Sequence, residues 1–417
     1  EAGDFPEWEL GVQLFSEEQA AGFDFDHLDP TKLIPEEVVP LRVIGRMVLD
    51  RNPANVHAET EQVAFCTQNL VPGIDFSDDP LLHGRNFSYL DTQLSRLGST
   101  NFNQIPINAP KCPFANMQRD GHMQTIIHPQ RVTYTPSLLD PSGPRESHTQ
   151  GFRSFATPLE GSKQRERSAT FADHYSQARQ FFHSQTEPEQ DHIIAALIFE
   201  LSKVEAAIVR ETLLGHLVVI DDDLGNRVAA GLGHTDAIVP ATPAVEPRAD
   251  LARAPSLSML ARGKPPLTGR QFGALVTDGA SAALMAGLQK AVAGAGAKLK
   301  IICPTIGGVT LDDGSKLKAD HQLAGGPSVL FDAVAVMTSQ AGTSALLGEA
   351  AAVAWVHDAF SHLKVIGATA EGRPLLDAAG VEDDEGVAIF KSGVEAFMAA
   401  AAAGRIWDRE PDVRTVY

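Results

Sequence analysis

Arg85 and Tyr89 are one helical turn apart in the sequence, a spacing that can place a guanidinium beside a phenol. A permanent cation next to a phenol favours the ionised oxygen. A phenolate is a hard ligand suited to ferric iron, and tyrosine is one of the side chains that bind haem iron. The chain has 4 tyrosines, so one placed among charged residues stands out. The pair predicts an iron-ligand site, and the alternative is a core tyrosine whose hydroxyl is hydrogen-bonded.

Composition narrows the classes of protein that could hold such a site. The chain has 417 residues, 43% of them hydrophobic and 21% charged, which is typical of a globular protein of two or three domains. The net charge of -19 argues against nucleic acid or an anionic membrane as a main partner. No run of about eighteen apolar residues predicts a membrane span. Three cysteines are too few and too scattered for a disulfide framework or a zinc knuckle.

The elements around the motif are short and rich in turns. The patterns at 8–15 and 41–52 predict strands bounded by turn residues. The residues 58–66 fit a helix or a strand, and their periodicity does not decide between them. A helix is predicted for the motif itself. The Pro-, Ser-, Gly- and Thr-rich residues 131–170 predict an extended arm.

After residue 170 the pattern of apolar residues changes twice. Apolar residues at helical spacing predict helices at 171–185, 189–217 and 221–233. A second linker follows at 236–268. Strands then alternate with helices, which predicts a doubly wound parallel sheet. The predicted strands are 271–279, 298–305, 329–339 and 363–370, and the predicted helices are 281–296, 344–362 and 394–405.

The polar motif as a whole resembles the proximal haem motif of monofunctional haem catalases, R-x-F-x-Y-x-D-T-Q. It is complete in Arg85, Phe87, Tyr89, Asp91, Thr92 and Gln93. Further blocks follow in that family's order: FPEWELGVQ, FDFDHLDPTKLIP, GRMVLDRNP, AETEQVAF, VPGIDFSDDPLL, NFNQIPIN and QRDGHM. The resemblance covers residues 1 to about 235. The appended α/β domain resembles that of large-subunit catalases, which is flavodoxin-like and related to class I glutamine amidotransferases.

The resemblance implies an α+β catalase fold followed by a flavodoxin-like, doubly wound α/β domain. The first part would comprise part of an antiparallel β-barrel, a wrapping arm and a helical domain. The expected domains are the C-terminal part of the haem-binding barrel region (1–130), the arm (131–170), the helical domain (171–235), a linker (236–268) and the α/β domain (269–417).

The family also implies roles for individual residues. Tyr89 would be the proximal phenolate ligand of haem, either haem b or its oxidised haem d form, and Arg85 would hydrogen-bond its oxygen. Asp79 would end a relay from Arg85, and otherwise it is a turn residue in SDDP. Arg96 would bind a haem propionate, and otherwise it is a solvated surface arginine. Phe87 is expected in the cofactor pocket with the rest of the motif.

Cys66 lies 23 positions before Tyr89. Large-subunit catalases can link the β-carbon of the ligand tyrosine to a residue at that spacing, a His in some members and a Cys in others. The resemblance therefore implies a Cys66–Tyr89 crosslink, and a buried free thiol is the alternative. Cys112 and Cys303 are predicted to be structural thiols.

The family's reaction is the dismutation of hydrogen peroxide to water and oxygen. Its distal histidine and asparagine belong to an N-terminal half that matches nothing in this chain. The chain opens on EAGDFPEWELGVQLF, without an initiator Met or a leader, so we expect an N-terminally truncated catalase that is weakly active alone. The expected partners are the missing N-terminal half and a homotetramer whose arms thread between subunits. Localisation stays open, cytoplasmic or secreted. The histidines near the motif (His57, His83, His122 and His128) are predicted to have no catalytic role.

The α/β domain lacks the nucleophile of its relatives. Their nucleophilic Cys stands in a tight turn after a strand, and in KVIGATAEG (364–372) Ala370 occupies that place. Neither the neighbouring Thr369 nor His357 and His362 predict a replacement. The domain is therefore predicted to be non-catalytic. The alternative function for the chain is a non-enzymatic scaffold or chaperone-like module built on this domain. A haem peroxide-rearranging enzyme such as an allene oxide synthase is disfavoured by the complete DTQ motif.

Overall fold

The computed structural model describes residues 3, 5–111, 120–127, 132, 134–141, 143–156, 158, 160–162, 164, 170–263, 267–391 and 393–414. The chain forms two compact units. The first comprises 1–185 and 193–257, and the second comprises 186–192 and 258–417. The division after residue 257 falls inside the linker expected at 236–268. Cys112 and His128 lie outside the described residues. No helix in the described part of the chain is long and apolar enough to cross a membrane.

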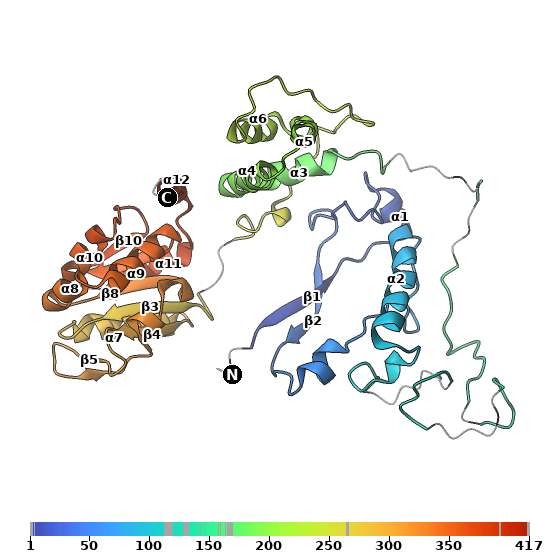
Figure 1. The fold of residues 1–417 in the computed structure, drawn as a ribbon, viewed down its shortest axis with the longest axis horizontal. Helices are drawn as coiled ribbons and strands as arrows, with labels where there is room; N and C mark the ends of the chain where they lie inside the picture. The colour runs from blue at the N-terminus through green and yellow to red at the C-terminus, as the bar shows by residue number, and fades with distance from the viewer. Residues whose placement is uncertain are drawn as a thin grey trace. The chain divides into compact units, whose positions relative to one another are not determined.

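The first unit begins with two antiparallel strands, β1 (Glu7–Val12) and β2 (Arg42–Val48), which run side by side in Figure 1. They confirm the strands predicted at 8–15 and 41–52. Most of their side chains are exposed, including apolar ones such as Leu10. A two-stranded sheet with exposed apolar side chains normally packs against further structure. The pair fits part of a larger sheet, and the expected barrel stays a prediction.

The helix of the polar motif is α2 (Pro80–Leu97). Asp79 caps its first turn, where Oδ1 accepts a hydrogen bond from the backbone N–H of Leu81 at 2.8 Å. Gly98 ends it in the left-handed region, with φ of 74°. The shorter neighbours are α1 (Glu17–Ala21), the π-helical turn η1 (His57–Glu61) and the 3-10 turn η2 (Phe102–Gln104). Residues 58–66, which fitted a helix or a strand, form a single helical turn followed by irregular chain.

Four helices follow the arm: α3 (Ser176–Ser184), α4 (Glu187–Ser202), α5 (Ala207–Ile220) and α6 (Asp222–Gly231). They confirm the helical region expected after residue 171. The single pattern at 189–217 is two helices, because the chain turns after Ser202 and Arg210 Nη1 donates to the carbonyl of Val204 inside the connection. The packed core uses apolar side chains of all four helices, with Leu214 and Val228 almost fully buried.

The second unit contains a six-stranded parallel sheet in the order β10-β9-β8-β3-β4-β7 (Figure 1). Its strands are β3 (Gln271–Val276), β4 (Lys298–Cys303), β7 (His321–Gln322), β8 (Ala333–Met337), β9 (Val365–Thr369) and β10 (Val387–Phe390). The predicted parallel sheet is confirmed. The five longer strands run 2-1-3-4-5 in chain order, one of the two common doubly wound orders. A small antiparallel pair, β5 (Val309–Thr310) and β6 (Lys316–Leu317), lies apart from the sheet.

Helices cover both faces of this sheet. Successive side chains of a strand alternate between two cores: Ala274 packs into one, with α7 and α11, and Leu275 into the other, with α9 and α10. The helices are α7 (Ala282–Gly294), α8 (Gln340–Leu346), α9 (Ala350–Ser361), α10 (Arg373–Ala378), α11 (Glu395–Ala403) and α12 (Glu410–Arg414). The helix expected at 344–362 is broken between Leu347 and Glu349, which separates α8 from α9.

Glu189 lies in the first turn of α4 and is the centre of a group of hydrogen bonds. This turn, within residues 186–192, belongs to the second unit. The Glu189 carboxylate accepts hydrogen bonds from the hydroxyl of Ser258 at 2.6 Å, from the hydroxyl and backbone N–H of Thr186, and from the backbone N–H groups of Met259 and Leu260. Partial burial works to raise the pKa of this carboxyl, but these donors outweigh it and lower the pKa from 4.5 to about 2.

A Glu189→Gln variant is therefore expected to lose about 2 kcal/mol of unfolding free energy near neutral pH, because charge-assisted hydrogen bonds disappear. The folded-state pKa is depressed, so the stabilisation is present above pH 4.5 and is lost as pH falls towards 2. Urea titrations at neutral and acidic pH measure the difference between variant and wild type. Glu200→Gln, on the exposed side of the same helix, is the matched control. An equal loss in both variants would contradict the expectation.

Candidate functional site

Tyr89 stands in the middle of α2 with its phenol partly buried, and Arg85 reaches it from one turn earlier. Arg85 Nη2 donates to the Tyr89 hydroxyl oxygen at 2.8 Å, and Arg85 Cζ lies 4.9 Å from the ring centroid. The shared helix face inferred from the spacing is confirmed. A hydroxyl oxygen has two lone pairs, so one can accept from Arg85 while the other faces a metal ion. The phenol oxygen therefore fits the role of one ligand to an iron ion.

Phe65 and Cys66 lie against the same stretch of α2. The rings of Phe65 and Tyr89 meet edge to face, with centroids 5.4 Å apart and an interplanar angle of 79°. Cys66 is buried and is a free thiol. The structure therefore brings the segment that contains Cys66 to the tyrosine. The crosslink between Cys66 and Tyr89 stays a prediction.

Arg96 holds the chain just before Phe65 and Cys66. Its Nη1 donates to the carbonyl of Glu61 at 2.5 Å, and its Nη2 donates to the carbonyl of Val63 and to Gln93 Oε1, both at 2.6 Å. Arg96 also lines an open hollow of 510 Å³ together with Asn55, His57, Ala58, Glu61, Gln62 and Leu97. Its side chain is not a freely solvated surface arginine, and its contact with a haem propionate stays a prediction.

Two other residues of the motif lie away from the phenol. Asp79 is the N-cap of α2, so its described contact is with its own helix rather than with Arg85. Phe87 is 75% exposed. It does not face Tyr89, because side chains two apart on a helix point in different directions. The relay role of Asp79 and the cofactor contact of Phe87 stay predictions.

Sequence reasoning missed the buried amides around the tyrosine. Asn86 and Gln93 are buried on α2, and Asn108 accepts from the backbone N–H of Ala64 and donates to the carbonyls of Gln62 and Phe102. The signal was available, because Asn86, Tyr89 and Gln93 recur at helical spacing. The sequence does not indicate their partners: Asn86 binds Thr67 across 19 residues, Gln93 binds Phe65 across 28, and Asn108 binds Ala64 across 44.

In the second unit, Ala370 begins the 3-10 turn η6 (Ala370–Gly372) directly after β9. The tight turn expected there is present, with a methyl group where a nucleophile would stand. Burial raises the pKa of the Cys303 thiol to about 11, helped by the negative charges of Asp278 and Asp320. This thiol is therefore protonated and inert near neutral pH, as expected for a structural cysteine.

The carboxyl ends of β3 and β8, where doubly wound sheets usually bind ligands, are closed by their own side chains. A Cβ at Gly342 would lie 2.0 Å from Thr277 Oγ1. Ser339 donates from its hydroxyl to the carbonyl of Asp278 at 2.6 Å and from its backbone N–H to Thr277 Oγ1 at 3.1 Å. Helix α8 thus packs directly on the end of β3. Among the described residues, no group of three His, Cys, Asp or Glu side chains could hold a metal ion.

Comparisons with known families cover most of the chain. The model described as Catalase matches residues 1–141, the model described as Catalase-related immune-responsive matches 168–232, and the C-terminal domain found in long catalases matches 268–411. The first match contains Arg85 and Tyr89.

Individual relatives align along nearly the whole chain. Catalase C of Rhizobium meliloti (strain 1021) is 52% identical over 99% of this chain and 59% of its own length. Catalase HPII of Pseudomonas aeruginosa is 42% identical over 100% of this chain and 59% of its own length. Catalase-2 of Bacillus subtilis (strain 168) is 41% identical over 98% of this chain and 60% of its own length. The chain therefore spans about three fifths of the length of these relatives.

Proposed function

Since the chain belongs to the catalase family, in its long, large-subunit branch, we propose that it supplies the iron-ligand side of an enzyme that converts two hydrogen peroxide molecules into two water molecules and one oxygen molecule. The observation behind the proposal is the Tyr89 oxygen, which Arg85 reaches at 2.8 Å on a capped helix. The catalase match over 1–141 contains both residues.

The cofactor of this reaction is haem, as the catalase family implies. Haem, when bound, supplies the redox chemistry. Tyr89 would bind its iron through the phenolate oxygen, and Arg85 would stabilise that oxygen through a charge-assisted hydrogen bond. We further propose that Asp79 ends the relay behind Arg85, that Arg96 binds a propionate and that Phe87 borders the cofactor. Both haem b and haem d suit this ligand set.

We propose that Cys66 forms a covalent bond from its sulfur to the β-carbon of Tyr89. Closing this C–S bond removes one hydrogen from the thiol and one from the β-carbon, and one hydrogen peroxide accepts both and becomes two water molecules. The burial of Cys66 beside Phe65, whose ring touches Tyr89, supports the pairing.

Mass spectrometry of peptides from peroxide-exposed, haem-loaded protein tests this bond. The two peptides are expected to run as one species, lighter than their sum by two hydrogen atoms, and to separate in Cys66→Ser. Two unlinked peptides at full haem occupancy would contradict the crosslink and leave the ligand assignment intact.

The proposed protein partners are inferred from apolar side chains that are exposed on the first unit. The two faces of the β1–β2 pair and the residues of the extended arm expose large apolar groups: Trp8, Leu10, Val43, Ile44, Met47, Tyr134, Leu138, Phe152 and Phe155. Patches of this kind mark interaction surfaces. We propose that the strands pack against the N-terminal half of a catalase, and that the arm packs between subunits of a homotetramer.

Haem uptake is the test of the proposed function. The chain would be mixed with hemin, first alone and then fused behind the N-terminal part of the Rhizobium meliloti relative, and its visible spectrum and oxygen release from peroxide would be recorded. We expect little oxygen release alone, and a phenolate-type ferric spectrum with rapid oxygen release in the fusion. A fusion that binds no haem would contradict the proposal.

A second function, a non-enzymatic scaffold built on the flavodoxin-like α/β domain, is favoured by two observations. Ala370 removes the nucleophile, and α8 closes the ends of the central strands. In this case the fused protein would bind no haem, and residues 258–417 alone would suppress the aggregation of an unfolded client protein. We assign the domain itself a stabilising or assembly role within the catalase.

A further inference from the structure

One face of α2 is a stripe of polar side chains with Tyr89 at its centre. Asn86, Tyr89, Gln93 and Arg96 follow at intervals of three, four and three residues, so they lie on one side of the helix. Asn86 is 8% exposed and Gln93 is 4% exposed, whereas Phe87 on the opposite side is 75% exposed. Buried amides need hydrogen-bond partners, and these two find them in the segment 61–68.

The bonds hold that segment on either side of the tyrosine. Gln93 Nε2 donates to the carbonyl of Phe65 at 2.9 Å, one turn after Tyr89. The hydroxyl of Thr67 donates to Asn86 Oδ1 at 2.6 Å, one turn before it. These bonds involve side chains of α2 rather than a backbone ladder, and Arg96 adds its own bonds to the carbonyls of Glu61 and Val63. The position of the segment therefore depends on a few individual side chains.

The Phe65 ring is the part of the segment that touches the phenol. Its edge-to-face contact with Tyr89 has a centroid separation of 5.4 Å. The ring is 60% exposed, so little else in the described structure fixes it and its position follows its backbone. Asn108 binds the backbone N–H of the neighbouring Ala64 at 2.9 Å, but Gln93 binds the carbonyl of Phe65 itself, so its amide acts most directly on where the ring stands against the phenol.

We propose that Gln93 is a positioning residue for Tyr89, which acts through Phe65 and keeps the phenol oxygen in one direction. A carboxamide suits the task because it donates and accepts at once: Nε2 donates to Phe65, and Oε1 accepts from Arg96 Nη2 at 2.6 Å. A carboxylate keeps the second bond and loses the first, and leucine loses both. The inference deepens the proposed ligand role of Tyr89 and rests on it for its function.

Fluorine NMR of the full, haem-free chain labelled with ortho-fluorotyrosine tests the positioning role directly. The chain has 4 tyrosines, and the Tyr89 lines are assigned by their loss in Tyr89→Phe. In Gln93→Glu the Tyr89 ring is expected to flip about tenfold faster, the equivalent of one lost hydrogen bond. Gln93→Leu is expected to show at least that increase.

Two comparisons separate positioning from general loosening of the fold. Tyr175 packs in the helical part of the first unit, where its hydroxyl pairs with His216 at 2.7 Å, and its lines are expected to stay unchanged. Gln180→Glu makes the same exchange at an amide that donates to the carbonyl of Ala252 at 2.9 Å. It is expected to leave the Tyr89 lines as they are.

The haem-loaded fusion gives a second readout. The phenolate-to-iron charge-transfer band is expected to shift in Gln93→Glu and to stay in place in Gln180→Glu. Unchanged Tyr89 lines in both Gln93 variants, or equal changes at Tyr89 and Tyr175, would overturn the positioning role. If the fusion binds no haem but the Gln93 variants show faster flipping of the Tyr89 ring, the proposed function is contradicted and the positioning role is supported.

Discussion

Replacing Tyr89 by phenylalanine is expected to abolish haem-dependent oxygen release, with a loss greater than the ~10–100-fold that removal of a metal ligand's own partner costs. Phenylalanine keeps the ring that meets Phe65 at 5.4 Å, but it lacks the oxygen that Arg85 reaches at 2.8 Å. The variant therefore removes the proposed ligand atom with little change in packing. Visible spectra and oxygen release of the haem-loaded fusion measure the effect.

Tyr134→Phe is the control for this experiment, because it makes the same exchange in the exposed arm and keeps the apolar ring that is proposed to pack between subunits. Its spectrum and activity should match those of the parent protein. Arg85→Leu should fall between the two variants, since the proposed ligand remains but its charge-assisted hydrogen bond is gone. A Tyr89→Phe protein with an unchanged ferric spectrum would show that another group binds the iron.

Lys364→Met is expected to change the stability of the second unit with a sign that depends on pH. Lys364 is 2% exposed, and its Nζ donates to the carbonyl of Ser328 at 2.7 Å. Burial lowers the pKa of this amine from 10.5 to about 8; repulsion by Arg405 adds to the shift, and Asp332 and Asp358 oppose it. Protonation of the buried amine below pH 8 therefore raises the free energy of the folded state relative to the unfolded state.

The size of the effect follows from linkage. Below pH 8 the buried charge costs about 3 kcal/mol, and this cost disappears as pH rises from 8 to 10.5, where only the unfolded state still holds the proton. Methionine removes that cost and also a hydrogen bond worth about 1 kcal/mol. The variant should be more stable than wild type by about 2 kcal/mol at neutral pH, and less stable by about 1 kcal/mol above pH 10.5.

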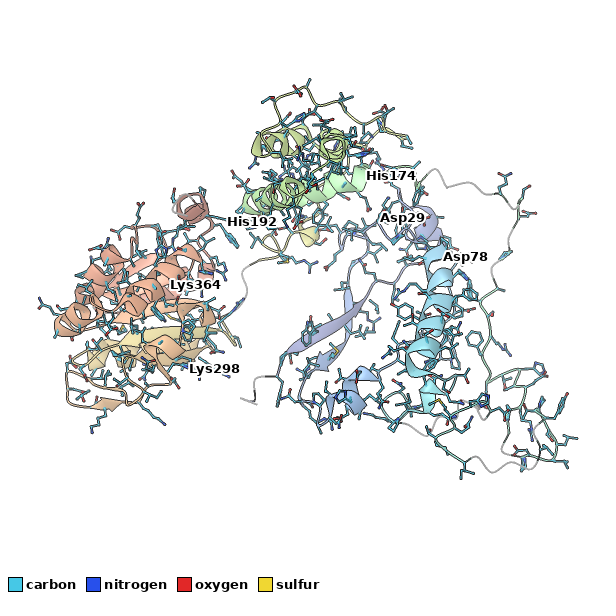
Figure 2. The ribbon with its side chains drawn as sticks, viewed as in Figure 1. Asp29, Asp78, His174, His192, Lys298 and Lys364 are labelled. Atoms are coloured by element: carbon cyan, nitrogen blue, oxygen red, sulfur yellow. The ribbon has the colours of Figure 1, made fainter. Side chains whose placement is uncertain are left out.

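Denaturant titrations across this pH range measure the difference between wild type and variant. Lys298→Met is the control: Lys298 is exposed at the start of β4, and both lysines are labelled in Figure 2. Its difference from wild type should be small, as is usual for a substitution on the surface. A difference for Lys364→Met that stays flat with pH would mean that the buried amine has an ordinary pKa.

Regular elements were predictable because their signals are local. The strands at 271–279 and 298–305 are apolar runs of the right length, and the structure contains both as β3 and β4. The breaks inside long patterns were not predictable. Residues 344–362 keep helical periodicity across Gly348, and only tertiary packing shows that α8 and α9 are separate.

The candidate site divides in the same way. The contact between Arg85 and Tyr89 depends on one helical turn, so spacing alone predicted it. The bond between Gln93 and Phe65 spans 28 residues, and no periodic pattern links the two positions. The closure of the strand ends was equally hidden, because the contact between Gly342 and Thr277 depends on how α8 sits on the sheet. Long-range side-chain bonds therefore had to be read from the structure.

The way α2 holds the segment 61–68 also has a consequence for the order of folding. Asn86, Gln93 and Arg96 face the segment together only after α2 has formed, so the segment has no binding surface in a chain whose helix is still open. Conservative mutations in α2 are then expected to slow folding, whereas those in the segment mainly speed unfolding. The environment of Tyr89 would be among the last parts of this region to settle, and a nascent chain would become ready for its cofactor only then.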